Sequence, residues 1–379
     1  MKQLKFVSDD VRQKEFAAAV RTNVNDYFKR TGVSTKGNFF LVTQTVANLL
    51  AYLGTFVLIL TVPMSPWLAL PLSVLMGFGM AGIGMCVMHD AVHGSYSTSA
   101  GLNKLMGGTM YLLGSNVFNW KVQHNLMHHA YTNIEGYDED IAAKGPIRLS
   151  EFTPWKKIHR RQHIHAFFFY GLMTISKLTN DFKQLALYNK EGITQRHHIN
   201  PTWEYVKMLV VKGGYLFAFI GLPVILTPFT WWQVLIGFFI MHWTAGCILS
   251  TVFQMAHVVE GAKQFKPDAD GVIAAEWAVH ELRTTSDFAR GNALLNWYIG
   301  GLNFQIEHHL FPNICHVHYR EIAPIVERTA KEFGFVYNLK PSFSAAFHSH
   351  VNRLRQLGEG GQGQGPTPVV MATPVAGHA

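Results

Sequence analysis

Three clusters of histidines are the residues of this chain best suited to chemistry. They are His89 and His93 in HDAVH, His124, His128 and His129 in HNLMHH, and His308 and His309 in QIEHH, with His257 as one more candidate. Imidazole nitrogen is a good ligand for iron, zinc and copper. Eight such nitrogens exceed what one ion can use. They suit two ions that each keep an open position for dioxygen or water.

Helical spacing predicts how these imidazoles are shared. Residues four apart lie on one face of an α-helix, so His124 and His128 should point together, while His129 should be rotated by about 100°. The neighbours His308 and His309 diverge, so this pair can serve both ions. A single His-x-x-x-His pair is usually only a solvated helix face, but three clusters together indicate a metal centre.

Other metal sites fit the sequence less well. A single structural zinc would want four ligands, usually including cysteine, and none of the three clusters contains a cysteine. The metalloprotease pattern H-E-x-x-H is absent. The Glu-x-x-His motif of carboxylate-rich di-iron bundles is absent as well.

The elements that must position these histidines are four apolar stretches, at about 41–62, 67–88, 207–226 and 231–253. Each is long enough to cross a hydrocarbon core about 30 Å thick. Short turns near Pro63 and Pro228 join them into two hairpins. Two shorter runs, Leu105–Phe118 and Ala166–Ile175, are expected to be interfacial helices. The sequence therefore predicts an all-α integral membrane protein with four transmembrane helices and a helical cytoplasmic cap.

The basic residues predict the orientation of the spans. Of 32 Lys and Arg residues, 8 lie in residues 1–40, 12 in 89–206 and 10 in 256–379, and the two short turns hold none. Positive charge is retained on the cytoplasmic side, so both termini and the histidines should lie there. The alternative, four buried helices of a large soluble protein, fits this asymmetry less well. The basic residues form no dense run of the kind that binds nucleic acid.

Three regions are expected along the chain. Residues 1–40 should be a cytoplasmic N-terminal segment, helical around Asp10–Lys29, without the features of a secretory signal. Residues 41–350 should form the catalytic domain, and the Gly/Pro-rich residues 358–379 a disordered tail. Three separated cysteines, Cys86, Cys247 and Cys315, imply no disulfide framework and fit a reducing side of the membrane.

The three clusters, in this order and beside these hairpins, resemble the membrane fatty acid desaturase family. Its pattern of H-x(3,4)-H, H-x(2,3)-H-H and H/Q-x-x-H-H reads here as HDAVH, HNLMHH and QIEHH, over roughly residues 37–340. Gln305 in the third cluster is similar to the front-end and linoleoyl-CoA desaturase-like members. The resemblance implies a di-iron centre of two iron ions held by the eight histidines, His257 among them. It places Gln305 where a weak or water-mediated ligand could stand.

The activity that this resemblance implies is removal of two hydrogens from an acyl chain by dioxygen, giving a cis double bond. The acyl chain would be carried as an acyl-CoA, an acyl-carrier-protein thioester or a membrane lipid. The HPGG motif of a fused haem domain is absent, so electrons should come from a separate ferredoxin or cytochrome-type donor with its reductase. We expect the protein in a bacterial cytoplasmic membrane, with its active site on the cytoplasmic face.

Two alternatives stay open beside this reading. A hydroxylase, ketolase or epoxygenase can use the same histidine clusters. A membrane metal transporter or sensor would instead place its histidines within the spans, whereas nearly all of these lie outside them.

Several other polar residues have competing interpretations. Asp90 could orient an imidazole or be a solvated or capping carboxylate. The loop after the second cluster (Glu135, Asp138, Glu139 and Asp140) is expected to be solvated; the alternatives are attraction of basic residues of a donor protein and a role beside the metal ligands. Further histidines are expected at the surface or headgroup level (His159, His163, His165, His197 and His198), and His316 and His318 are expected to have no role as ligands. His242, within the fourth span, is either functional or a neutral, hydrogen-bonded residue.

Overall fold

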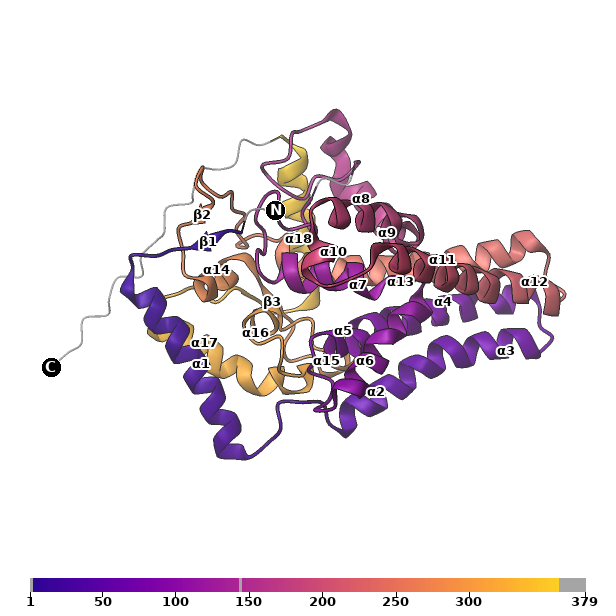
Figure 1. Cartoon of the computed structure of the whole chain (residues 1–379), viewed down its shortest axis with the longest axis horizontal. Coiled ribbons are helices and arrows are strands. Elements are labelled where there is room, and N and C mark those ends of the chain that lie inside the picture. The colour runs from indigo at the N-terminus through magenta and orange to yellow at the C-terminus, as the bar shows by residue number, and fades with distance from the viewer. Residues whose placement is uncertain (1–2, 143–144, 361–379) are drawn as a thin grey trace.

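The computed structural model describes residues 3–142 and 145–360, and most of them are helical. Long helices extend to one side of the molecule, and a cap of shorter helices lies at the other end (Figure 1). Within the described residues, four helices are long and apolar enough to cross a membrane: Phe39–Thr61, Pro66–Val92, Pro201–Leu226 and Trp231–His257. The prediction of an all-α, four-span membrane protein is confirmed.

Capping residues set where each span begins. The side chains of Asn38, Ser65 and Asn200 accept hydrogen bonds from backbone N–H groups of the first helical turn, and Thr230 forms a capping box with Gln233. Proline at the first helical position follows both Ser65 and Asn200, which favours a helix start. The helix that carries the third span therefore begins at Pro201, ahead of the apolar stretch predicted from about residue 207.

Three of the spans contain short π-helical stretches. The first consists of α2 (Phe39–Leu49), η1 (Leu50–Gly54) and α3 (Thr55–Thr61). The second consists of α4 (Pro66–Gly82), η2 (Ile83–Met88) and α5 (His89–Val92). The third consists of α11 (Pro201–Leu216), η6 (Phe217–Gly221) and α12 (Leu222–Leu226), and the fourth is α13 (Trp231–His257). The second and fourth spans run further than predicted and so carry His89 and His257 themselves.

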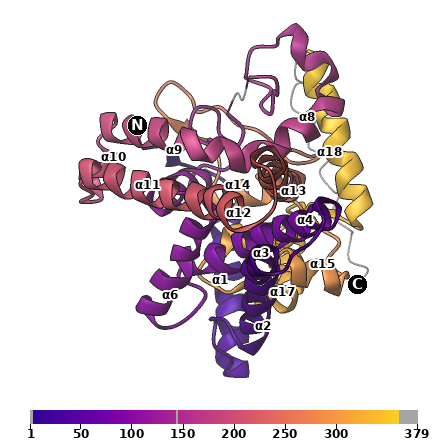
Figure 2. The same ribbon diagram turned by 90° about the vertical axis from the view of Figure 1, so that its right-hand side faces the viewer.

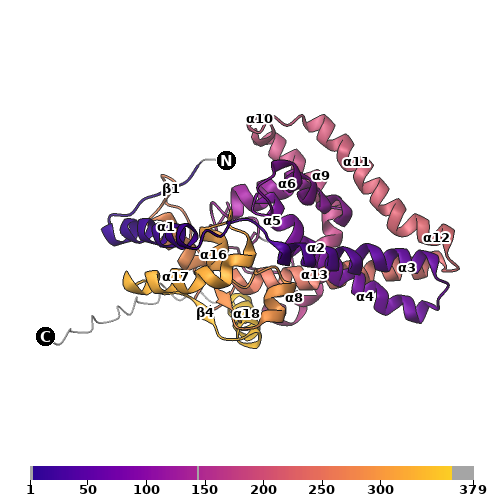
Figure 3. The ribbon, with the colours of Figure 1, turned by 90° about the horizontal axis from the view of Figure 1, so that it is seen from below.

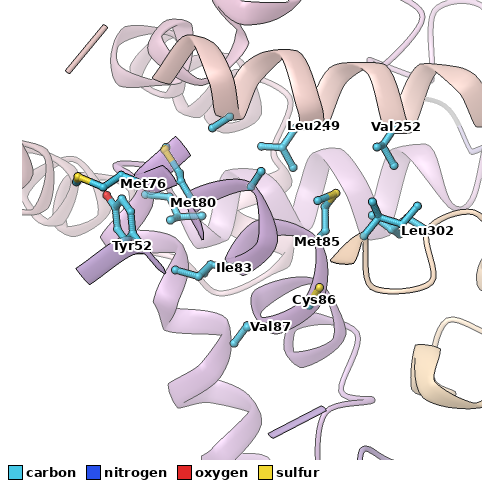
Figure 4. Close-up of a cluster of buried hydrophobic side chains, with 14 of the residues drawn as sticks. Tyr52, Met76, Met80, Ile83, Met85, Cys86, Val87, Leu249, Val252 and Leu302 are labelled. Atoms are coloured by element: carbon cyan, nitrogen blue, oxygen red, sulfur yellow. The ribbon is translucent and has the colours of Figure 1, made fainter. Parts of the chain in front are cut away.

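The first and fourth spans pack closely against the second one. A Cβ atom at Gly77 would lie 2.6 Å from the carbonyl oxygen of Met241, and one at Gly79 would lie 2.6 Å from the backbone nitrogen of Tyr52. Such small residues let membrane helices approach each other. Figure 4 shows the buried side chains that fill this core, among them Met80, Ile83 and Leu249. The second span is therefore held firmly where it delivers His89.

The cap packs around α1 (Val11–Thr31), which confirms the helix expected near Asp10–Lys29. Phe16, Val20 and Val24 on α1 contact a second apolar cluster that includes residues of α14 (Trp277–Thr284), α16 (Gln305–Leu310) and α17 (Tyr319–Glu332). Figure 3 shows α1, α16 and α17 together at the end of the molecule opposite α3 and α12. The strand pairs are only two residues long: β1 (Lys5–Phe6) runs parallel to β2 (Val272–Ile273), and β3 (Asp287–Phe288) to β4 (Leu339–Lys340).

Short helices connect the two hairpins and complete the cap. The run expected near Leu105–Phe118 forms α6 (Ala100–Gly107), η3 (Gly108–Leu113) and the start of α7 (Val117–Trp120), before the π-helix η4 (Lys121–His128). The run near Ala166–Ile175 falls in α8 (Gln162–Gly171) and α9 (Met173–Lys190), after the 3-10 helix η5 (Lys157–Arg161). The remaining elements are α10 (Ile193–Arg196), α15 (Ala293–Tyr298), η7 (His316–His318) and α18 (Phe343–Gly358).

Neither short run yields a fifth spanning helix in the described part of the chain. Helix α18 continues to Gly358, past the predicted end of the domain at residue 350. The expected disordered tail falls mainly on residues 361–379, which lie outside the described residues.

Candidate metal centre

The fold brings all eight predicted histidines into one buried pocket between spans and cap. His89 lies at the end of the second span, His257 ends the fourth, and the second and third clusters come from η4 and α16. Seven of the eight are at most 6% exposed, and His93 is half-buried. Segments more than 200 residues apart therefore converge on a single site.

The ring nitrogens form two groups. His89, His93, His124 and His308 each offer one nitrogen within 4.8 Å of the others, and His128, His257 and His309 form a second such group. His129 lies between them, with ring centroids 4.5 Å from His308 and 4.4 Å from His309. This arrangement fits two ions that lie side by side.

The shortest nitrogen contacts have the spacing of metal ligands. The Nε2 atoms of His89 and His124 are 3.0 Å apart, and those of His124 and His129 are 3.2 Å apart. Two nitrogens bound at about 2.1 Å and at right angles on one ion are separated by about 3.0 Å. The first group is therefore shaped for one ion.

The prediction that His129 would be rotated away from His124 was wrong. The second cluster lies on a π-helix, in which the N–H of His129 bonds to the carbonyl oxygen of His124 at 3.0 Å. A π-helix joins residues five apart by hydrogen bonds, so His129 comes close to His124. His128 instead joins the second group, where its ring centroid is 4.7 Å from that of His257.

Buried nitrogens without a partner test whether these residues fit metal ions. Atoms of seven residues of the site are buried and make no hydrogen bond: Nε2 of His93, His128, His257, His308 and His309, Nδ1 of His129, and Nε2 of Gln305. An unsatisfied buried polar group costs about 1–3 kcal/mol. Seven unpaired nitrogens in one pocket are better explained by coordination to metal ions than by a core that leaves them without partners.

The opposite nitrogens of several rings are held by neighbours. Nδ1 of His128 lies 3.1 Å from both carboxylate oxygens of Asp138. Nδ1 of His308 lies 3.1 Å from the hydroxyl of Tyr319. Nδ1 of His309 lies 2.9 Å from the carboxylate of Glu281 and 3.1 Å from the hydroxyl of Thr132. Such partners fix ring orientation and leave Nε2 free for a metal.

Burial sets the charge of most of these rings. It lowers the pKa of His93, His124, His129, His308 and His309 well below the usual value, and the surrounding imidazoles lower it further. These rings are therefore neutral at physiological pH. Neutral imidazole is the form that binds metal.

His128 differs from the other rings. Burial lowers its pKa, but Asp138 and Asp140 outweigh burial and raise the pKa to about 9. Asp138 is 2% exposed, so the prediction of a solvated acidic loop was wrong for this residue. The carboxylate of Asp138 also accepts hydrogen bonds from the backbone N–H groups of Asn133 and Asp140, so the loop wraps around this carboxylate.

Asp90 is neither a solvated carboxylate nor a hydrogen-bond partner of His89. It accepts hydrogen bonds from Nδ1 of His316 at 2.7 Å and from Sγ of Cys315 at 2.9 Å. Nε2 of His316 lies 3.0 Å from Oε1 of Gln44 on the first span. His316 stands apart from both imidazole groups, as predicted, but it joins the first histidine cluster to a neighbouring helix.

The remaining histidines lie outside both imidazole groups. His197 and His198 are exposed, as predicted. His159 is 2% exposed and hydrogen-bonds to backbone groups, so its expected surface position was wrong. His242 is buried and bonded through both nitrogens, to Tyr215 at 2.8 Å and Thr174 at 3.0 Å. This agrees with the interpretation of a hydrogen-bonded residue in the span.

A cavity of about 660 Å³ passes His124. Its inner part is apolar, lined by Met80, Gly84, Leu113 and Leu249, with Trp120 and Phe253 beside the histidine. Its outer part is polar, lined by Lys177, Asn180, Lys183 and Gln184 of α9 and by Glu139 and Asp140. Its shape and polarity suit a long apolar chain with a polar end.

The fold spans a membrane and holds a buried, metal-compatible polyhistidine centre beside an apolar cavity. These are the features of an integral membrane oxidoreductase. The family model described as fatty acid desaturase matches residues 65–341. The chain is 32% identical to an sn-1 linoleoyl-lipid 6-desaturase of Synechocystis sp., over 92% of this chain and 97% of that protein. It is 33% identical to a protein of the same name from Arthrospira platensis, over 90% and 92%.

A more distant relative is longer than this chain. An acyl-lipid (8-3)-desaturase of Physcomitrium patens is 31% identical over 92% of this chain and 73% of that protein. Together, these matches show that the chain belongs to the fatty acid desaturase family. The predicted family and enzyme class are confirmed.

Proposed function

We propose that this protein inserts a double bond into a fatty-acyl chain on a membrane lipid, at two irons held by the eight histidines. The proposal rests mainly on one observation: two groups of imidazoles, with buried nitrogens that have no partner, converge beside an apolar cavity. His89, His93, His124 and His308 would hold one ion, and His128, His257 and His309 the other. His129 lies between the two groups, and Gln305, on the same helix as His308 and His309, has a buried amide nitrogen without a partner.

When bound, the irons would supply the dioxygen chemistry that removes two hydrogens from an unactivated methylene pair. With two external electrons and two protons, dioxygen leaves as two waters. The chain's own part is positioning, which is a major source of rate and selectivity. Trp120 and Phe253 line the cavity beside His124, so they hold the acyl chain against the centre. The apolar inner part receives the chain beyond the reacting carbons.

The cavity mouth supports a lipid carrier. Its basic side chains, Lys177 and Lys183, are balanced by the carboxylates of Glu139 and Asp140, while the carboxylate of Asp181 pairs with the buried Lys212. Coenzyme A carries several phosphates and acyl carrier protein is acidic, so a mouth without net positive charge would attract neither of them. A neutral or zwitterionic headgroup pairs with such a mixed surface more readily. Two relatives carry names that specify lipid-linked linoleoyl groups, which supports the same carrier.

We also propose that a ferredoxin or cytochrome-type protein, with its reductase, supplies the electrons. We place the protein in a bacterial cytoplasmic membrane with the centre on the cytoplasmic side. The charge distribution supports this orientation, because the cap and connecting segments hold nearly all basic residues.

The test is product analysis in a host that lacks the activity. The chain is expressed with a ferredoxin and its reductase, and acyl groups from separated lipid classes and from the acyl-CoA pool are identified by mass spectrometry. We expect a new unsaturated acyl group to appear first in glycerolipids. A hydroxylated product would contradict desaturation, and a product that appears first on coenzyme A would contradict the carrier. The His124→Ala variant, compared at equal membrane content, is the negative control.

A further inference from the structure

We infer that residues 155–168 form a preformed surface that binds anionic lipid headgroups at the membrane boundary. We call this stretch, the end of one loop with η5 and most of α8, the 155–168 platform. Its outward side chains are of two kinds. Four are basic: Lys156, Lys157, Arg160 and Arg161. Four are large and apolar: Trp155, Ile158, Ile164 and Phe168.

The exposure of these side chains is unusual for a folded loop. Ile158, Ile164 and Phe168 are 53%, 66% and 53% exposed. Within residues 3–142 and 145–360, none of the ion pairs uses the four basic side chains. The protein itself therefore covers neither the apolar nor the charged groups. Basic and aromatic side chains mixed in this way are typical of segments that lie on anionic membrane surfaces.

Buried polar groups hold the platform in shape from inside. The guanidinium of Arg148, which is 5% exposed, donates to the carbonyl oxygens of Thr153, Glu151 and Leu357 at 2.5–2.7 Å. The ring of His159 accepts a hydrogen bond from the N–H of Lys156 at 3.0 Å and donates one to the carbonyl oxygen of Gly145 at 3.2 Å. The surface is thus fixed before any ligand arrives, so binding costs little ordering entropy.

Contacts with the fourth span place α8 at the depth of the membrane boundary. Sγ of Cys247 lies 3.5 Å from the carbonyl oxygen of Phe167, and Oγ of Ser250 lies 3.3 Å from that of Tyr170. Cys247 is sixteen residues after the start of α13, or about 24 Å along the helix axis, which is close to the far boundary of a hydrocarbon core about 30 Å thick. Figure 2, which looks along the spans, shows α8 beside α18 at the edge of the bundle. Ile164 and Phe168 therefore face outward alongside a span.

Residues that flank the platform in the chain line the catalytic cavity. Ile147 and Leu149 precede the platform, Phe169 and Tyr170 follow it, and all four belong to the cavity wall. The platform thus joins the membrane surface to the wall of the site that receives the acyl chain. An acidic electron-donor protein could also meet the four basic groups. The exposed isoleucine and phenylalanine alongside a span favour lipid.

The experiment measures lipid binding by the full-length protein in neutral detergent. Dioleoyl phosphatidylglycerol or dioleoyl phosphatidylcholine is titrated in, and bound lipid is counted by native mass spectrometry. The test variant replaces the four basic residues by glutamine: Lys156→Gln, Lys157→Gln, Arg160→Gln and Arg161→Gln. A matched control removes four exposed charges from α1, on the far side of the cap: Lys14→Gln, Arg21→Gln, Lys29→Gln and Arg30→Gln.

We expect the platform variant to bind phosphatidylglycerol about tenfold more weakly, or worse, with phosphatidylcholine binding unchanged. The control should bind both lipids as the wild type does. Equal phosphatidylglycerol affinity in wild type and platform variant would overturn the inference, and so would an equal loss in the control. If the platform variant instead raised only the KM for a ferredoxin in phosphatidylcholine bicelles, the surface would be a donor site. Lipid binding is measured without metal or turnover, so the result of this test is independent of the proposed reaction.

Discussion

Asp138 offers the most direct test of how the protein supports its metal ligands. Both of its carboxylate oxygens lie 3.1 Å from Nδ1 of His128, and each also accepts a backbone N–H, from Asn133 or Asp140. Asp138→Asn keeps the shape but removes the charge, and it turns an NH₂ group toward one of those donors. His128 then loses the partner that fixes its orientation.

The expected loss follows from these contacts. Removing such a supporting partner lowers metal affinity about 10–100-fold, or about 1.4–2.7 kcal/mol. A buried donor left unsatisfied adds about 1–3 kcal/mol of instability to the loop. Iron affinity is measured by chelator competition, and folding by thermal unfolding in detergent. Glu135→Gln is the matched control, because Glu135 lies in the same loop but bonds to Ser150. Wild-type iron affinity in Asp138→Asn would refute the reasoning.

The other predictions concern the ligands, the cavity and the topology. His129→Ala should abolish product formation at normal membrane content, because the His129 ring lies between both imidazole groups. His197→Ala should retain activity, because His197 is exposed. Equal activities of the two variants would contradict the assignment. Gly84→Phe should shift products toward shorter acyl chains, because its ring would fill the inner cavity. Gly84→Ala should leave the products unchanged, because its Cβ would lie at an ordinary contact distance of 3.4 Å from Leu249. An unchanged chain-length profile in Gly84→Phe would mean that the acyl chain lies elsewhere. Reporters inserted near residue 35 and at the C-terminus should both read cytoplasmic, and an outside signal from either would reverse the predicted orientation.

The eight clustered histidines could be predicted from the sequence because their spacing is local and repeated. The partners that orient them could not. Thr132 meets His309 across 177 residues, and Glu281 meets the same ring from a different helix. Only tertiary packing brings such groups together. Asp138 gave a weak local signal, as a carboxylate ten residues after His128 in a tight turn.

Helix geometry explains the other differences. The π-helical turn at Lys121–His128 leaves no hydropathy signature, yet it brings Nε2 of His129 as well as the ring of His128 close to His124. The π-helix η2 likewise lies directly before His89. The start of the third span was marked by Asn200-Pro201, a capping signal that apolar content alone does not reveal. Hydropathy thus predicted the number of spanning helices better than the residues at which those helices begin.

The metal content of the purified protein tests the central claim most directly. Protein isolated without oxygen and without added metal is analysed for iron and zinc by mass spectrometry, and its activity is followed as iron is removed and restored. The account predicts two irons per chain, lost in His124→Ala and His128→Ala and kept in His197→Ala. One zinc per chain, with activity independent of iron, would contradict it.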